Sequence, residues 1–205
     1  MSVNGPDDPV HAPYGPLPRG GTVRPITRWG APVMHQPQRA VTADQFGGDD
    51  LRGLAADMVA TMYAADGVGL AACQVGVDLA VFVFDCPDES GQRSVGVVCN
   101  PTVTVPEQRG RTLDDGDEGC LSFPGAFCPC ARPAFATVDG FGLDGERVAY
   151  EGRGLLARCL QHESDHLVGI VFGDRLSKRT RKKLYKEADR VAAEFPSGWP
   201  VVTAE

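Results

Sequence analysis

The sequence has no long apolar segment. Its longest uninterrupted apolar run covers only residues 79–84, whereas a membrane-spanning helix needs about 20 apolar residues. The N-terminus also lacks the basic stretch followed by an apolar stretch that is typical of a secretory signal. These absences exclude a transmembrane helix, and we expect the chain to stay in the cytoplasm where it is made.

An excess of positive charge is also missing. The 205 residues carry a formal net charge of −7, which is unlike a general nucleic-acid-binding protein, so we expect no specific binding to DNA. One stretch departs from this balance, because residues 178–190 carry seven Lys and Arg against Glu187 and Asp189. This pattern fits either a solvated helix face or a docking surface for a polyanion, and both interpretations stay open.

The sequence has few histidines and an odd number of cysteines. There are four His and seven Cys. Because no export signal accompanies the cysteines, reduced thiols that act as small buried apolar groups are favoured over a disulfide framework. Cys128 and Cys130 are separated by one residue, which is shorter than the usual spacing of a structural metal clip, so packing is the favoured role for both.

The spacing of apolar residues predicts a mixed α+β fold. Residues 1–21 contain five Pro and four Gly without periodicity, and we expect a disordered or loosely packed arm. Helices are predicted at 50–65, 154–168 and 177–194, and strands at 79–84, 95–99, 102–105, 134–138 and 147–150, with a hairpin turn at Asp144-Gly145. Strands and helices do not alternate regularly, which favours a single α+β domain over residues 22–195, followed by a short tail at 196–205.

The segment His162-Glu163-Ser164-Asp165-His166 carries the strongest chemical signal. Residues four apart lie on one face of a helix, so both imidazoles can reach a single cation. Glu163 lies beside them and can accept a proton from a water molecule activated by that cation. Asp165 has three interpretations: it accepts a hydrogen bond from a ligand histidine, it caps nearby backbone, or it faces solvent.

A catalytic site of this kind needs a third protein ligand and one position for water. Cys120, within Glu118-Gly119-Cys120-Leu121-Ser122, is the best candidate, because a thiolate binds borderline metals strongly and the glycine permits close backbone approach. Glu187 is the rival ligand and would make the protein a zinc endopeptidase. It lies in the most basic stretch of the chain, where a solvated salt bridge is the expected use.

The segment Gly67 to Gln74, directly after the first predicted helix, is rich in small residues. Small residues let the backbone pass close to a bound peptide, and the Gln74 amide offers two N–H donors. The same segment is equally typical of a plain helix-to-strand turn with Gln74 on the surface.

Taken in order, three segments resemble the signatures of the bacterial peptide deformylase family. The family's G-x-G-x-A-A-x-Q loop, E-G-C-L-S segment and Q-H-E-x-D-H helix are matched in full by residues 67–74, 118–122 and 161–166. The family's entry segment of the I-x-x-x-G-x-P type is resembled upstream by Ile26, Gly30, Pro32 and Met34. The likeness spans about residues 22–195. It implies antiparallel β-sheets packed around a central helix that carries the HExxH motif, with a C-terminal helix.

The resemblance also implies a function and a set of site residues. The function is hydrolysis of the N-formyl group from the N-terminal methionine of newly synthesised polypeptides, which releases formate. Implied metal ligands are Cys120, His162 and His166; implied catalytic groups are Glu163, the Gln74 side chain and the Leu121 backbone N–H; implied substrate-binding residues are Val68, Gly69, Gly119, Leu155, Arg158 and Cys159. Glu118 and Arg132 match a family ion pair. Arg158 departs from the family, which has an apolar residue there, but its aliphatic stem can still line a methionine pocket.

The implied cofactor is one divalent metal ion, Fe2+ in the cell, with Zn2+, Ni2+ or Co2+ also suited to two imidazoles and a thiolate. The implied partners are N-formyl-Met nascent polypeptides. The family works near the ribosomal exit, which would give residues 178–190 a ribosome contact. Two other functions stay open: a zinc endopeptidase that uses Glu187, and a non-catalytic ribosome-associated metal-binding module.

Overall fold

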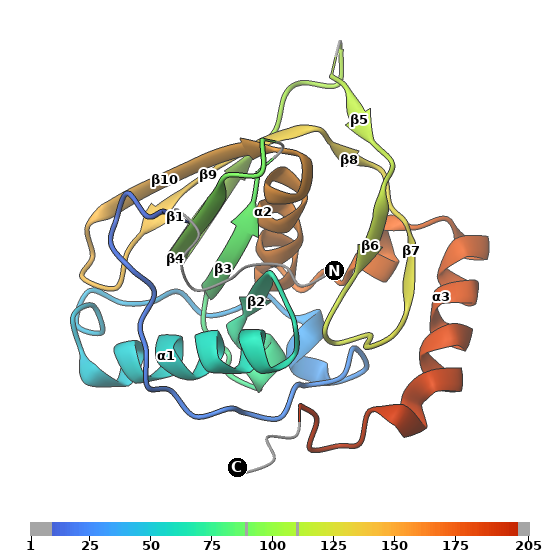
Figure 1. The fold of residues 1–205 in the computed structure, drawn as a ribbon, viewed down its shortest axis with the longest axis horizontal. Helices are drawn as coiled ribbons and strands as arrows, with labels where there is room; N and C mark the ends of the chain where they lie inside the picture. The colour runs from blue at the N-terminus through green and yellow to red at the C-terminus, as the bar shows by residue number, and fades with distance from the viewer. Residues whose placement is uncertain (1–9, 89, 110, 201–205) are drawn as a thin grey trace.

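The computed structural model describes residues 10–88, 90–109 and 111–200. In this part of the chain one six-stranded sheet forms the centre of the fold (Figure 1). Its path is β10-β9-β4-β3-β2 with every neighbour antiparallel, and β1 pairs in parallel with β4. The strands are β1 (Val10–His11), β2 (Gly69–Ala71), β3 (Val81–Pro87), β4 (Arg93–Thr104), β9 (Phe135–Phe141) and β10 (Arg147–Arg153).

The three predicted helices are confirmed. They are α1 (Asp49–Ala64), α2 (Gly154–Leu167) and α3 (Lys178–Val191), and α3 continues into the 3-10 turn η4 (Ala192–Glu194). Ser177 begins α3 by accepting a hydrogen bond from the backbone N–H of Thr180 at 3.2 Å. Three further 3-10 turns are η1 (Pro32–His35), η2 (Ala72–Val75) and η3 (Phe172–Arg175). Helices and antiparallel strands together give the mixed architecture that the sequence predicts.

Strand β3 explains how the sheet holds a helix on each of its faces. Alternate residues of a strand point to opposite faces. Val81 and Val83 join the apolar cluster that contains the buried side of α1, while Phe82 and Phe84 join the cluster that contains α2. Because both faces are covered, this strand is apolar at successive positions.

Two short ribbons cover α2 on the side away from the sheet, and the sequence did not predict them. They are β5 (Leu113–Asp114) with β8 (Arg132–Pro133), and β6 (Asp117–Gly119) with β7 (Phe127–Pro129). Figure 1 shows β6 and β7 between α2 and α3. Runs of two or three residues are too short to show alternating polarity, so periodicity could not reveal them.

The prediction of two strands at 95–99 and 102–105 is wrong, because both belong to β4. The pairing of β4 with β9 shifts register between Cys99 and Thr102. Asn100 adopts a φ of 51° at this point. A bulge of this kind bends a strand without ending it. The turn expected at Asp144-Gly145 is confirmed, since Gly142 N–H donates to the Glu146 carbonyl at 2.8 Å.

Part of the N-terminal segment lies against the domain. The expected arm includes residues 1–9, which fall outside the described residues. Tyr14 packs edge-to-face on Tyr150 with ring centroids 5.3 Å apart, and its hydroxyl accepts a hydrogen bond from Ala149 N–H at 3.0 Å. Among the described residues, no helix combines the length and apolarity needed to cross a membrane.

We expect two glycine-to-alanine substitutions to change stability in opposite directions. A Cβ at Gly96 would lie 2.3 Å from Tyr150 Oη and 2.8 Å from Phe84 Cε1 in the core, so Gly96→Ala should lower the free energy of unfolding by about 1–3 kcal/mol. Gly53 is exposed within α1, and a Cβ there would have nothing within 4 Å, so Gly53→Ala should raise it by about 0.5–1 kcal/mol. Urea denaturation measures both, and a Gly96→Ala protein of undiminished stability would contradict the packing described.

Candidate metal centre and active-site cleft

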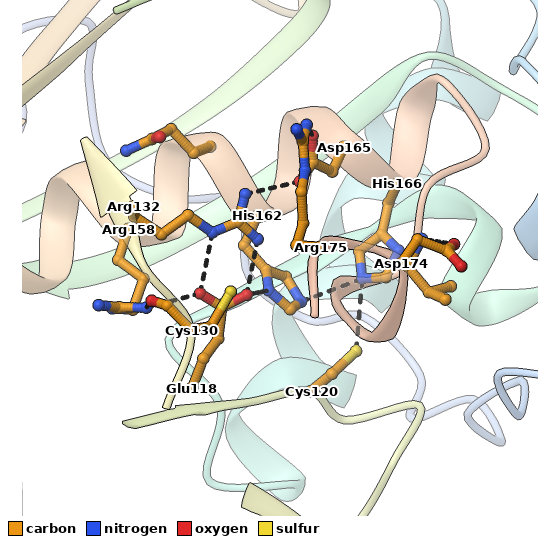
Figure 2. A network of polar contacts seen from close by, with 12 residues as sticks. Glu118, Cys120, Cys130, Arg132, Arg158, His162, Asp165, His166, Asp174 and Arg175 are labelled. Carbon is orange, nitrogen blue, oxygen red and sulfur yellow. Dashed lines mark hydrogen bonds and ion pairs between the residues drawn. The ribbon is translucent and has the colours of Figure 1, made fainter. Parts of the chain in front are cut away.

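Three side chains that are distant in sequence converge at one point. His162 and His166 lie one turn apart on α2, and Cys120 follows strand β6 (Figure 2). His166 Nε2 lies 3.1 Å from His162 Nε2 and 3.4 Å from Cys120 Sγ. All three side chains are buried. The structure therefore brings together the three ligands that the sequence predicts.

The donor set suits a divalent metal ion. One ligand atom from each of the three residues lies within 4.8 Å of the other two, and among the described residues they are the only such group of His, Cys, Asp and Glu. Two imidazole nitrogens and a sulfur are ligands for zinc, iron(II), nickel or cobalt. The rival ligand Glu187 is instead partly exposed and pairs with Arg190 at 2.6 Å.

Glu118 holds the metal ligands in position. Its Oε1 accepts hydrogen bonds from His162 Nδ1 at 2.7 Å and from Arg132 Nη2 at 2.6 Å. Its Oε2 accepts from Arg132 Nε at 3.0 Å and from Arg158 Nη1 at 2.8 Å. Because Nδ1 of His162 carries the proton, its Nε2 is left to face Cys120 and His166. The predicted contact between Glu118 and Arg132 is confirmed.

The charge of Glu118 is maintained despite its burial. Burial alone would raise the pKa of this carboxyl, but the hydrogen bond from His162 and the ion pair with Arg132 hold the pKa well below its usual range. A carboxylate is therefore present at the centre of this network (Figure 2).

All three interpretations of Asp165 are wrong. Its side chain is buried and accepts hydrogen bonds from Arg132 Nη1 at 2.6 Å and Arg175 Nε at 2.9 Å. Among the described residues, the Asp165 carboxylate thus accepts no hydrogen bond from a ligand histidine or from a backbone N–H, and it is shielded from solvent. It fixes the opposite end of the guanidinium that binds Glu118, and so supports the metal ligands indirectly.

Glu163 lacks the full set of hydrogen-bond partners that most polar groups of α2 have. Its side chain is buried, and its Oε2 has no hydrogen-bond partner among the described residues. Burial raises the pKa of this carboxyl to about 7, while the nearby His162 opposes the rise. Its Oε1 lies 2.6 Å from the place that a Cβ on Gly69 would occupy. Only glycine at this position of β2 leaves room for the carboxylate.

Gln74 is buried beside the metal ligands, so its interpretation as a surface residue is wrong. Its Oε1 accepts a hydrogen bond from the Ala71 backbone N–H at 2.8 Å, which fixes the amide orientation. Its Nε2 then donates to Cys120 Sγ at 3.5 Å and to Ser122 Oγ at 3.3 Å. The amide N–H group therefore faces the candidate centre.

A cleft with a volume of about 520 Å³ reaches the candidate centre. Every residue that the sequence analysis proposed for substrate binding or catalysis lines it: Val68, Gly69, Gln74, Gly119, Leu121, Leu155, Arg158, Cys159 and Glu163. The sequence analysis missed several others: Ala65, Asp66, Pro124, Gly125, Phe127, Phe195 and Trp199. No local motif marked them, because they face the cleft only after distant segments have packed together.

Arg158 both lines the cleft and forms buried polar contacts. Its Nη1 donates to Glu118 Oε2 and, at 2.6 Å, to the Cys130 carbonyl, and its Nη2 lies 3.2 Å from Asp114 Oδ1. The guanidinium is thus turned into the protein and paired. The rest of the side chain is available to line the cleft.

We expect Glu118→Gln to weaken metal binding. An amide cannot accept from His162, Arg132 and Arg158 together, so the affinity for Zn2+ should fall by about 10- to 100-fold. Arg132 and Arg158 each keep one acidic partner, Asp165 and Asp114, but lose the buried carboxylate that they share, which should lower the free energy of unfolding by about 3–5 kcal/mol. Competition with a chromogenic chelator measures the first effect and urea denaturation of the metal-loaded protein the second.

The matched control is Asp78→Asn, which removes a carboxylate that pairs with the exposed Arg39. It should leave the Zn2+ affinity unchanged. Equal Zn2+ affinities of the Glu118→Gln and unsubstituted proteins would show that the network does not support the ligands.

Comparison with known proteins agrees with this geometry. The family model described as polypeptide deformylase matches residues 23–182. Peptide deformylase 1 of Streptomyces avermitilis is 53% identical over 183 residues, covering 89% of this chain and 81% of the relative. The peptide deformylase of Mycolicibacterium paratuberculosis is 49% identical over 164 residues, covering 77% of this chain and 83% of the relative.

Solved structures give the same result. The peptide deformylase of Ehrlichia chaffeensis superposes with a TM-score of 0.74 at 31% identity, covering 84% of this chain and 98% of that one. The peptide deformylase of Thermus thermophilus gives a TM-score of 0.69 at 37% identity, covering 84% and 99%. With its Cys120, His162 and His166 cluster, this chain belongs to the polypeptide deformylase family and is a metal-dependent hydrolase.

Proposed function

We propose that the protein removes the N-formyl group from the N-terminal methionine of newly synthesised polypeptides and releases formate. The observation that carries this proposal is the position of Glu163. A buried carboxylate oxygen without a partner in the described structure lies beside three converging metal-ligand atoms, at the floor of a cleft. That arrangement supports hydrolysis by a water molecule whose proton passes to Glu163.

The proposed ligands of the metal ion are Cys120 Sγ and the Nε2 atoms of His162 and His166. When bound, the ion polarises the formyl carbonyl and lowers the pKa of water. We propose Fe2+ as the ion in the cell, and Zn2+, Ni2+ or Co2+ also suit these donors.

The protein's own groups carry the proton and the developing charge. Glu163 accepts the proton of the attacking water and then passes it to the departing amine. The side-chain N–H of Gln74 and the backbone N–H of Leu121 stabilise the negative charge that develops on the formyl oxygen. Gln74 suits this role because its Oε1 is held by Ala71, which keeps the amide nitrogen on the side of Cys120.

The methionine is proposed to bind at the α2 end of the cleft. Leu155, the stem of Arg158 and Cys159 supply the apolar surface there. Val68, Gly69 and Gly119 bring backbone to the cleft, where a peptide can form hydrogen bonds. The Cys159 thiol already donates to the Val68 carbonyl at 3.5 Å, which ties the pocket floor to this wall.

Two further proposals concern the domain as a whole and its basic stretch. We propose that residues 22–195 act as one catalytic domain. We also propose that the basic stretch 178–190, which forms most of α3, contacts the ribosome through its RNA. The zinc endopeptidase and the non-catalytic module are not favoured, because Glu187 takes no part in the ligand cluster and the chain matches deformylases over most of its length.

We expect Glu163→Gln to abolish formate release from formyl-Met-Ala-Ser while the metal content stays unchanged. The amide keeps the shape of the side chain but cannot accept a proton, and loss of a general base costs about 10²- to 10⁴-fold in rate. Formate is measured with a coupled formate dehydrogenase assay at defined Ni2+ or Fe2+ loading. A near-normal rate in this variant would rule out the assigned role.

We expect Cys120→Ser to lose the metal ion, because a neutral hydroxyl is a much poorer ligand than a thiolate. Glu187→Gln is the matched control and should keep both metal and activity. Elemental analysis after dialysis gives the metal content. The opposite result, in which Glu187→Gln loses the metal and Cys120→Ser keeps it, would identify the endopeptidase arrangement.

A further inference from the structure

The C-terminal segment contributes to the lining of the catalytic cleft. Phe195 and Trp199 line the same cavity as Cys120 and Glu163. Their ring centroids are 5.2 Å apart in an edge-to-face arrangement, and both side chains are partly buried. Two large apolar side chains at this place are unexplained by the catalytic and metal-binding roles assigned above.

Several contacts anchor this C-terminal segment. The Ile26 N–H donates to the Trp199 carbonyl at 2.8 Å. The Arg28 guanidinium donates to the carbonyls of Phe195 and Pro196 and lies 6.0 Å from the centre of the Trp199 ring. The segment is therefore held by residues 26–28 of the same chain.

Phe195 also packs against a glycine that no other residue could replace without strain. Gly125 has a φ of 74°, and a Cβ there would lie 2.8 Å from Phe195 Cε2. This close approach fixes the ring over the loop that follows Cys120.

Residues 26 and 27 also connect the backbone of the C-terminal segment with that of Gln74. The Ile26 N–H donates to the Trp199 backbone carbonyl, and the adjacent Thr27 N–H donates to the Gln74 backbone carbonyl at 2.8 Å. Gln74 in turn reaches Cys120 Sγ. These backbone contacts bring Trp199 close to Gln74 in the fold. Leu155, Arg158 and Cys159 of α2 form another part of its lining.

We propose that Phe195 and Trp199 form an acyl-side wall, which sets the size of the acyl group that the enzyme removes. The inference rests on the proposed function. If the methionine side chain lies at the α2 end and its amide lies between Gln74 and Glu163, the substituent on the acyl carbon points toward the aromatic pair. A formyl group presents only hydrogen there, whereas the alkyl group of an acetyl or propionyl amide collides with the wall.

The test compares formyl-, acetyl- and propionyl-Met-Ala-Ser as substrates of the Ni2+-loaded enzyme. Trp199→Ala should lower the ratio of kcat/KM for formyl over propionyl by about 10-fold or more, since one or two methylene groups decide selectivities of that size. Trp199→Leu, which keeps an apolar contact with Phe195, should give a smaller change in the same direction. The acyl product is quantified by chromatography.

Phe127→Ala is the matched control. Phe127 also lines the cleft, but it is 69% exposed and its ring packs on Gly119 at the β6–β7 ribbon. Its removal should leave the acyl ratio unchanged. The proposal would be wrong if Trp199→Ala left the ratio of kcat/KM for formyl over propionyl peptide unchanged. It would also be wrong if the variant lost activity equally on all three peptides.

Binding separates this inference from the proposed function. Dissociation constants of the formyl and propionyl peptides are measured by calorimetry on Glu163→Gln protein, with and without Trp199→Ala. A shift in their ratio supports the wall even if the unsubstituted enzyme releases no formate, in which case the function alone fails. Formate release without a shift in either ratio would refute the wall and leave the function standing.

Discussion

The buried carboxylate of Glu118 is the interaction on which the rest of the site depends. A charge removed from water is unfavourable unless it is paired and hydrogen-bonded. Glu118 meets this requirement with donors from β8 and α2, namely Arg132, Arg158 and His162. Cys120 lies two residues beyond Glu118, so the network that satisfies the carboxylate also fixes the distance between the cysteine loop and the histidine helix.

This constraint explains why a polar helix can occupy the centre of the fold. Every residue of α2 from Leu156 to Leu167 is buried, although many of these side chains are polar. Most of the polar groups have partners: Gln161 donates to the Pro133 carbonyl at 2.9 Å, and Ser164 to the Leu160 carbonyl at 2.7 Å. Within the described structure, Glu163 Oε2 and His166 Nδ1 are the exceptions on this helix. Because most buried polar groups of this helix have hydrogen-bond partners, a buried polar atom without one is a candidate for a catalytic or metal-binding role.

The residues that line the cleft come from segments that are far apart in the sequence. Its lining comes from α2, from the segment that follows α1, from the segment around Cys120 and from the C-terminal segment. Arg28 and Ile26 bring that last segment into place although it is far away in sequence. Specificity can therefore be set by residues far from the signatures that identify the chemistry.

The sequence by itself determined the three helices, the two histidine ligands and a leading candidate for the third ligand. Helices reveal themselves through local periodicity, and the spacing of His162 and His166 places both imidazoles on one face without any tertiary contact. Cys120 was the best sequence candidate for the third ligand against Glu187, and the tertiary structure places its sulfur beside the two histidines. The identity of the family rests on the same local segments, which is why the similarity to known deformylases agrees with it.

Only the tertiary structure decided how these groups are supported and enclosed. The contacts of Asp165 with Arg132 and Arg175, the joining of two expected strands into β4, and the position of Trp199 were all missed. Each depends on contacts between residues that are far apart in the chain, and such contacts leave no periodic pattern in the sequence around them. Local chemistry thus identified the reacting groups, while long-range packing fixed their partners and the shape of the cleft.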